Sequence, residues 1–154
     1  MIEKENTVSS DLIYTGKTVS LRVDTVEVPN KGYQKREIVE HNGVVAVIAI
    51  TEDNKIILVK QYRKSIEDVV LEIPGGKLEL NENPRECAIR EFRKKTGYDA
   101  ESFKLIHKFY PSVGFSNQMI FIYLAKKLEK LEDKQEEQQI EIKEIDFDEV
   151  YKMV

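Results

Sequence analysis

The chain has 154 residues, of which 41% are hydrophobic and 34% charged, and this size and composition suit one folded domain rather than a disordered chain. Its net charge of -4, from 24 Lys+Arg against 28 Asp+Glu, argues against binding DNA or RNA through bulk charge. A single cysteine, Cys87, excludes an intrachain disulfide, and the apolar stretch 44–50 is far shorter than the roughly 20 residues of a membrane helix. We therefore expect a cytoplasmic protein with no membrane and no nucleic-acid partner.

Strand patterns dominate the first half of the chain. Residues 20–28 and 33–40 flank the turn signal Pro29-Asn30-Lys31-Gly32, which predicts an antiparallel hairpin. Residues 44–51 form a continuous β-branched run, typical of a strand buried on both faces. After a turn at 52–55, further extended segments are predicted over 56–61 and 69–73, the second entering a turn at Pro74-Gly75-Gly76.

A capped helix is the main feature of the second half. Asn83 suits the N-cap, Pro84 the first helical position and Glu86 the third, while Gly97 supplies the stop. Strands are predicted over 103–109 and 119–125, then a charged, solvated connection over 126–143 that leads to a short strand, and the start of a helix over 147–154. Many strands with one central helix indicate a mixed α+β domain.

The loop and helix after the glycines carry the most informative spacing. Gly76 is followed after five residues by Glu82, then after seven by Arg90-Glu91-Phe92, and then by Gly97-Tyr98. Glu91, Lys94 and Lys95 share one helix face, which by itself favours a surface ion pair between Glu91 and Lys95 worth about 0.3 kcal/mol. The complete spacing, however, resembles the Nudix box.

The resemblance extends outside the box, over segments 36–41, 59–63, 71–79 and 114–115, to the ADP-ribose pyrophosphatase branch of the Nudix superfamily. It implies a Nudix fold, a mixed β-sheet packed between helices, with an N-terminal antiparallel hairpin region. It also implies that residues 1–42 contribute to a homodimer and to the substrate site, and that residues 43–154 form the Nudix domain. The implied activity cleaves the diphosphate of ADP-ribose, or of a related nucleoside diphosphate sugar, to AMP and a sugar phosphate with Mg²⁺ or Mn²⁺.

Candidate site residues follow from the same resemblance, position by position. The carboxylates implied in catalysis are those of Glu91, Glu136 and Glu137. Oxygens of Gly75, Glu82 and Glu91 are implied to bind metal. The residues implied to bind substrate are Arg36, Glu37, Arg63, Gly114 and Phe115.

The match breaks at Lys94 and Lys95, which stand where the family has glutamates. Glutamates at this spacing bind hard divalent cations through oxygen, whereas a protonated lysine has no lone pair to offer. A dication about 4 Å from an ammonium would meet roughly 8 kcal/mol of repulsion at an effective dielectric near 20. The metal site is therefore weakened. Gln118 also stands where the branch tends to have an acid.

These departures leave more than one function open. The first is hydrolysis by the family reaction. The alternative is a domain that binds ADP-ribose-like ligands without cutting them, with Lys94 and Lys95 replacing the metal's charge. A third is an interaction domain that has lost its substrate site, against which the retained Arg63 and the double glycine argue.

Overall fold

The structure is a computed structural model that describes residues 3–132 and 139–153. The chain divides into two compact units, one made of Met1–Gly43 with Phe109–Met119 and the other of Val44–Lys108 with Ile120–Val154. The first unit therefore takes a segment from far along the chain. The boundary between residues 42 and 43 that the sequence suggests stays a prediction. None of the helices in the described ranges is long and apolar enough to cross a membrane.

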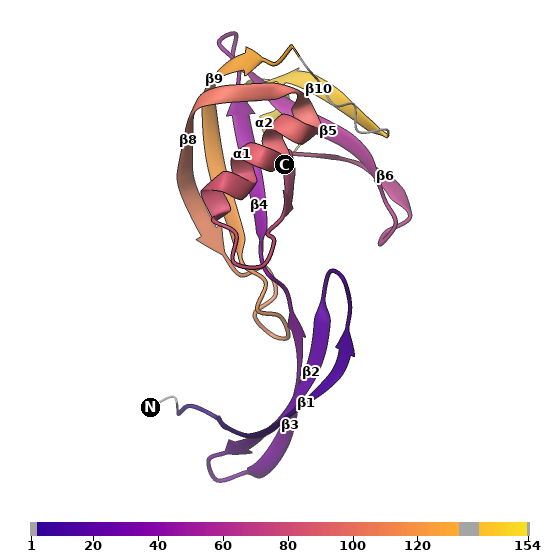
Figure 1. The fold of residues 1–154 in the computed structure, drawn as a ribbon, viewed down its shortest axis with the longest axis vertical. Coiled ribbons are helices and arrows are strands. Elements are labelled where there is room, and N and C mark those ends of the chain that lie inside the picture. Colours follow the sequence, from indigo (N-terminus) through magenta and orange to yellow (C-terminus); the bar gives the residue numbers. More distant parts are fainter. Residues whose placement is uncertain (1–2, 133–138, 154) are drawn as a thin grey trace. The chain divides into compact units, whose positions relative to one another are not determined.

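The first unit is built on a three-stranded antiparallel sheet (Figure 1). Its strands, in sheet order, are β1 (Asn6–Thr15), β2 (Ser20–Val28) and β3 (Gly32–Glu40). The predicted hairpin is confirmed, because β2 and β3 pair without interruption from Ser20 with Glu40 to Val28 with Gly32. The sequence did not predict β1. Its residues are all exposed and its pairing with β2 shifts register twice, so it lacks the regular alternation that signals a strand.

The segment 109–119 runs beside the end of β3 in the same unit. The amide of Val39 donates to the carbonyl oxygen of Phe115 at 2.8 Å, and the amide of Asn117 donates to the carbonyl oxygen of Val39 at 3.3 Å. The side chain of Asn117 also accepts a hydrogen bond of 2.9 Å from the amide of His41. These bonds attach the segment to β3.

Seven strands of the described ranges form the mixed sheet of the second unit. The central order is β10-β5-β4-β9-β8, with β6 paired to β5 and β7 to β4. Only β4 and β9 pair in parallel among the registers described for this sheet. The strands are β4 (Val44–Ile50), β5 (Lys55–Arg63), β6 (Asp68–Glu72), β7 (Gly75–Lys77), β8 (Tyr98–Phe109), β9 (Ile120–Lys130) and β10 (Ile140–Asp146).

Helix α1 (Pro84–Thr96) covers this sheet and packs on β4, β7 and β9 (Figure 1). Its predicted caps are confirmed: the side chain of Asn83 accepts from the amide of Arg85 at 2.9 Å, and Gly97 adopts a left-handed φ of 70°. The fully buried Phe92 meets Phe103 edge to face, with ring centroids 5.7 Å apart. A second helix, α2 (Phe147–Tyr151), contacts β5 and β10. The mixed sheet with few helices confirms the α+β fold class.

Two local expectations were wrong. The turn expected at Gly75 and Gly76 is instead the start of β7, where Gly75 pairs with Ala46. A Cβ at Gly75 would overlap the carbonyl oxygen of Val45, so glycine is needed there for close approach of two strands. The charged stretch 126–143 is also less of a loop than expected, because β9 continues to Lys130 and β10 begins at Ile140. Among its described residues, the exposed strand positions carry the charges of Lys126, Lys127, Glu129, Lys130 and Glu141.

Candidate functional site

Helix α1 places two side chains against the glycines of β7. Glu91 is only 9% exposed, and its carboxylate lies so close to Gly76 that a Cβ on that glycine would overlap it. Lys95, one helical turn later, donates a hydrogen bond from Nζ to the carbonyl oxygen of Gly75. The helix face that carries the departures from the Nudix box therefore contacts the backbone of both glycines.

Glu82 and Arg90 hold the preceding loop against the helix. The Nε and Nη2 atoms of Arg90 each donate to the Glu82 carboxylate at 2.9 Å, and the amide of Glu79 donates to it at the same distance. The hydrogen bonds from Arg90 are the main reason that the pKa of Glu82 falls from 4.5 to about 2. Arg90 also forms an ion pair with Glu91. Both oxygens of Glu82, expected to bind metal, are thus engaged in fixing the loop.

Arg63 and Glu72 lie on the neighbouring strands β5 and β6. Arg63 donates to the Glu72 carboxylate through Nε at 2.8 Å and through Nη2 at 2.5 Å, and Gln61 donates to it at 3.1 Å. These bonds, chiefly those of Arg63, lower the pKa of Glu72, and the charge of Lys95 lowers it further. The guanidinium of Arg63, the candidate phosphate-binding residue, is therefore already engaged by a carboxylate on the neighbouring strand.

The described residues do not fit the divalent cation that the family resemblance implies. Of the three helix positions, only Glu91 carries an oxygen donor, and Arg90 pairs with it. The Gly75 carbonyl accepts from Lys95. Within residues 3–132 and 139–153, no group of three or more His, Cys, Asp or Glu side chains is placed to hold a metal ion. The candidate carboxylates Glu136 and Glu137 lie outside the described residues.

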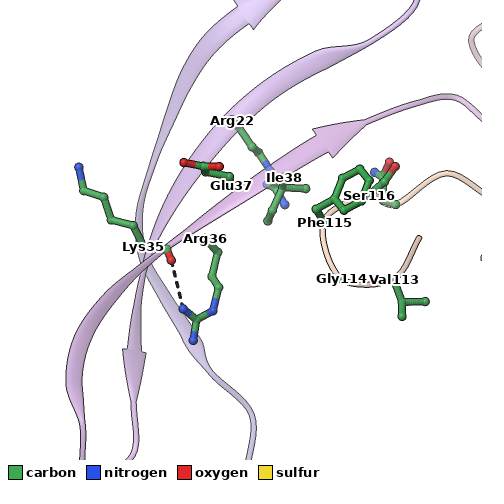
Figure 2. Close-up of a pocket in the computed structure, with 10 residues that line it drawn as sticks. Arg22, Lys35, Arg36, Glu37, Ile38, Val113, Gly114, Phe115 and Ser116 are labelled. Carbon is green, nitrogen blue, oxygen red and sulfur yellow. Dashed lines mark hydrogen bonds between the residues drawn. The ribbon is translucent and has the colours of Figure 1, made fainter. Parts of the chain in front are cut away.

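A second candidate region is a pocket of about 620 Å³ in the first unit (Figure 2). Four substrate-binding candidates line it, two from β3 and two from the segment 109–119, although they are about 78 positions apart in sequence. They are Arg36, Glu37, Gly114 and Phe115. The Phe115 side chain is 56% exposed, while its backbone is held to β3 by the bond from Val39. The aromatic ring is therefore accessible on a fixed backbone.

The charge of Arg36 at this pocket is partnered within the first unit. Arg36 donates to both oxygens of Glu5, at 2.9 and 2.6 Å, and also to the side chain of Gln34 at 3.1 Å. The hydrogen bonds to Glu5 raise the pKa of Arg36 and lower that of Glu5. Glu37 is exposed and, as the next residue in the strand, points to the opposite side of the sheet. Arg36 therefore pairs with Glu5 and not with its neighbour in the strand.

Four polar residues that the sequence did not indicate also line the pocket, namely Arg22, Lys35, Ser116 and Asn117. Arg22 lies opposite Ile38 in the β2–β3 register and contacts Asp24 and Glu40 at 3.5 and 3.3 Å. The paired hairpin register could have placed Arg22 beside the β3 candidates. No local pattern in the sequence could have placed Asn117, because its position depends on a segment far along the chain.

Comparison with known proteins decides the family. A NUDIX domain model matches residues 40–154. The chain belongs to the Nudix family. It is 42% identical to the ADP-ribose pyrophosphatase of Bacillus subtilis (strain 168) and 44% identical to the methanol dehydrogenase activator of Bacillus methanolicus, in each case over 98% of this chain and 83% of the relative. The assignment made from the spacing of the box is confirmed.

The Nudix protein is also similar to a more distant relative and to a solved structure. The chain is 36% identical to the ADP-ribose pyrophosphatase of Mycobacterium tuberculosis (strain ATCC 25618 / H37Rv), over 77% of this chain and 58% of that relative. A crystal structure of an ADP compounds hydrolase matches with a TM-score of 0.85, covering 99% of this chain and 84% of the other at 16% identity. The structural match shows the fold.

Proposed function

We propose that this Nudix protein hydrolyses the diphosphate of ADP-ribose, or of a related nucleoside diphosphate sugar, to AMP and a sugar phosphate. The observation that carries the proposal is the pocket that gathers Arg36, Glu37, Gly114 and Phe115 from two distant segments. Relatives that are ADP-ribose pyrophosphatases, one of them 42% identical over nearly the whole chain, support the substrate class. Hydrolysis adds water to one phosphorus, breaks its bond to the bridging oxygen and releases the other phosphate group.

Each of the two units, taken by itself, offers surfaces of the kind that such a substrate binds. The half-exposed ring of Phe115 offers a stacking surface for a nucleobase. A pocket of about 620 Å³ lies within the usual size range of small-molecule sites, about 300–1,000 Å³. In the second unit, the planar guanidinium of Arg63 suits phosphate oxygens, and a phosphate would compete with Glu72 for it. Glu91, with Glu136 and Glu137 outside the described residues, is the proposed source of catalytic carboxylates.

Product analysis tests this function. Purified protein is incubated with ADP-ribose in Mg²⁺, in Mn²⁺ and in EDTA, because the resemblance implies one of these metals while the described donors do not fit one. We expect AMP and ribose 5-phosphate in equal amounts, and R63A should slow their release. The K104Q variant, which removes one charge from an exposed position of β8, serves as the matched control. No AMP under any of the three conditions would refute hydrolysis.

A second candidate function, binding of the same ligand class without hydrolysis, is favoured by one observation. Lys95 engages the Gly75 carbonyl, so a cation other than a metal already contacts this part of the site. Calorimetry separates the two candidates. Heat of ADP-ribose binding without AMP release would support the binding function, and neither heat nor AMP would favour a domain that no longer takes this ligand.

We also propose a cytoplasmic homodimer in which the N-terminal strands of one copy contribute to the partner's substrate site, as the resemblance implies. The apolar side chains on β1 support it, because Val8, Leu12, Ile13 and Tyr14 are 58–65% exposed. Light scattering after size exclusion should give about twice the 17.9 kDa chain mass. L12E should shift the protein towards monomer. A wild-type monomer at micromolar concentration would refute the dimer.

A further inference from the structure

We propose that the ammonium of Lys95 takes the place of a divalent cation in the Nudix site and holds the substrate's diphosphate without a metal ion. This inference rests on the proposed substrate class and specifies how the site recognises it. It concerns Lys95 alone, because Lys95 is the residue whose ammonium contacts the Gly75 carbonyl.

The Lys95 ammonium contacts an oxygen atom of the kind that binds metal ions in other proteins. Lys95 donates to the carbonyl of Gly75, and its charge acts on the carboxylate of Glu72. Glu91, one turn earlier on the helix, has its carboxylate against the adjacent Gly76. A backbone carbonyl and carboxylates are the ligands of hard cations in proteins. Here the Gly75 carbonyl oxygen accepts a hydrogen bond from a cation that belongs to the chain itself.

The net charge of the helix face that carries Lys95 also supports this role. With Glu91 contributing -1 and Lys94 and Lys95 +1 each, this helix face carries +1. A diphosphate is attracted to such a face directly, whereas a face of three carboxylates would repel it unless metal ions intervened. Arg63 adds a second cation in this unit, bound to the Glu72 carboxylate whose pKa the charge of Lys95 also lowers. A divalent cation that entered would instead be repelled by the ammonium.

Regular structure fixes the positions of both Lys95 and Gly75. Lys95 lies on a helix whose ends are capped by Asn83 and Gly97 and whose core face is anchored by the buried Phe92. The carbonyl it contacts belongs to Gly75, which pairs with Ala46 of the central strand β4. Both partners of the hydrogen bond are therefore held by regular structure. Because the Lys95 side chain is already held in position, it loses little conformational entropy when it binds a phosphate.

Metal binding to the free protein gives the first test, and it needs no substrate. Binding of Mn²⁺ is followed by electron paramagnetic resonance for wild type, K95E and K104E, the last making the same charge reversal at an exposed position of β8. We expect K95E to bind Mn²⁺ at least about tenfold more tightly than wild type, because a carboxylate then joins Glu91 and the Gly75 carbonyl. K104E should match wild type. Equal affinities of wild type and K95E would overturn the replacement of the metal by Lys95.

Ligand binding gives the second test, by calorimetry of ADP-ribose in EDTA and in Mg²⁺. Wild type should bind equally in both buffers, and K95Q should bind about tenfold more weakly in EDTA, as loss of a charge-assisted bond predicts. K95R keeps the charge and should bind within about threefold of wild type, and K104Q should be unchanged. Circular dichroism confirms that each variant is folded.

The outcomes separate the two proposals. Wild-type binding that requires Mg²⁺, or K95Q that binds as tightly as wild type in EDTA, would overturn the role of Lys95 and leave the substrate class standing. Absence of ADP-ribose binding in either buffer would refute the proposed substrate, and with it the part of Lys95 in holding a diphosphate. In that case the Mn²⁺ comparison still decides whether Lys95 excludes the metal.

Discussion

Replacing Glu82 with Gln keeps the shape of the side chain and removes the charge that binds Arg90. Glu82 accepts two hydrogen bonds from Arg90 and one from the amide of Glu79, all at 2.9 Å. Bonds to a charged group are worth about 1.5–3 kcal/mol each when buried. The Arg90 side chain is 39% exposed, so water weakens them, and we expect E82Q to lower the free energy of unfolding by about 2 kcal/mol at pH 7.

The difference in unfolding free energy between wild type and E82Q should shrink as the pH falls. Arg90 lowers the pKa of Glu82 from 4.5 to about 2 in the folded protein. A carboxyl whose folded pKa is depressed stabilises the protein above its unfolded pKa, and this contribution is lost as pH falls to the folded value. The gap between wild type and E82Q should therefore be full at pH 7 and close between about pH 4.5 and pH 2.

Urea unfolding followed by circular dichroism measures this gap at pH 7, 4 and 2.5. The control is E79Q, which makes the same chemical change at an exposed position three residues earlier in the loop. It should unfold at the same urea concentration as wild type. If E82Q were as stable as wild type at pH 7, or if its deficit stayed constant down to pH 2.5, the loop would not depend on the Glu82–Arg90 pair.

Three further changes test the site and the core. R63A should raise the pKa of Glu72 towards its ordinary value, measured by carbon-13 NMR, because the hydrogen bonds of Arg63 are the main cause that lowers it. G75A should cost about 1–3 kcal/mol in urea unfolding, since its Cβ would overlap the backbone carbonyl oxygen of Val45; wild-type stability would contradict this packing. F92A should cost about 3–5 kcal/mol, because the ring is fully buried, and a loss below 1 kcal/mol would show that the core does not depend on it.

Short sequence patterns were enough to predict the elements whose boundaries are set by a few neighbouring residues. The caps of α1 were predictable because Asn83, Pro84 and Gly97 each answer a requirement of the helix backbone at one end. The hairpin of β2 and β3 was predictable for the same reason. In contrast, β1 is exposed along its whole length and irregular in register, and it forms a strand by pairing its backbone with β2.

For the candidate site, the spacing of the box named candidate residues, and the structure adds contacts that the spacing does not predict. The sequence placed Glu91 and Lys95 on one face of a helix and favoured a pairing between them. The structure shows that Lys95 bonds to the carbonyl of Gly75 and that Glu91 pairs with Arg90. Helical periodicity decides which side chains share a face, but it does not decide which strand lies opposite them.

The sequence by itself determined the family, the fold class, the capped helix and the replacement of two carboxylates by Lys94 and Lys95, because spacing and residue chemistry are local properties. Only the tertiary structure decided what surrounds Lys95, and it also brought Arg36 and Phe115 to one pocket. Both results depend on pairing between segments distant in the chain, β7 with β4 in one unit and residues 115–117 with β3 in the other. Backbone hydrogen bonds between such segments leave no local pattern in the sequence, so the position of the ammonium beside the Gly75 carbonyl could be read only from the folded chain.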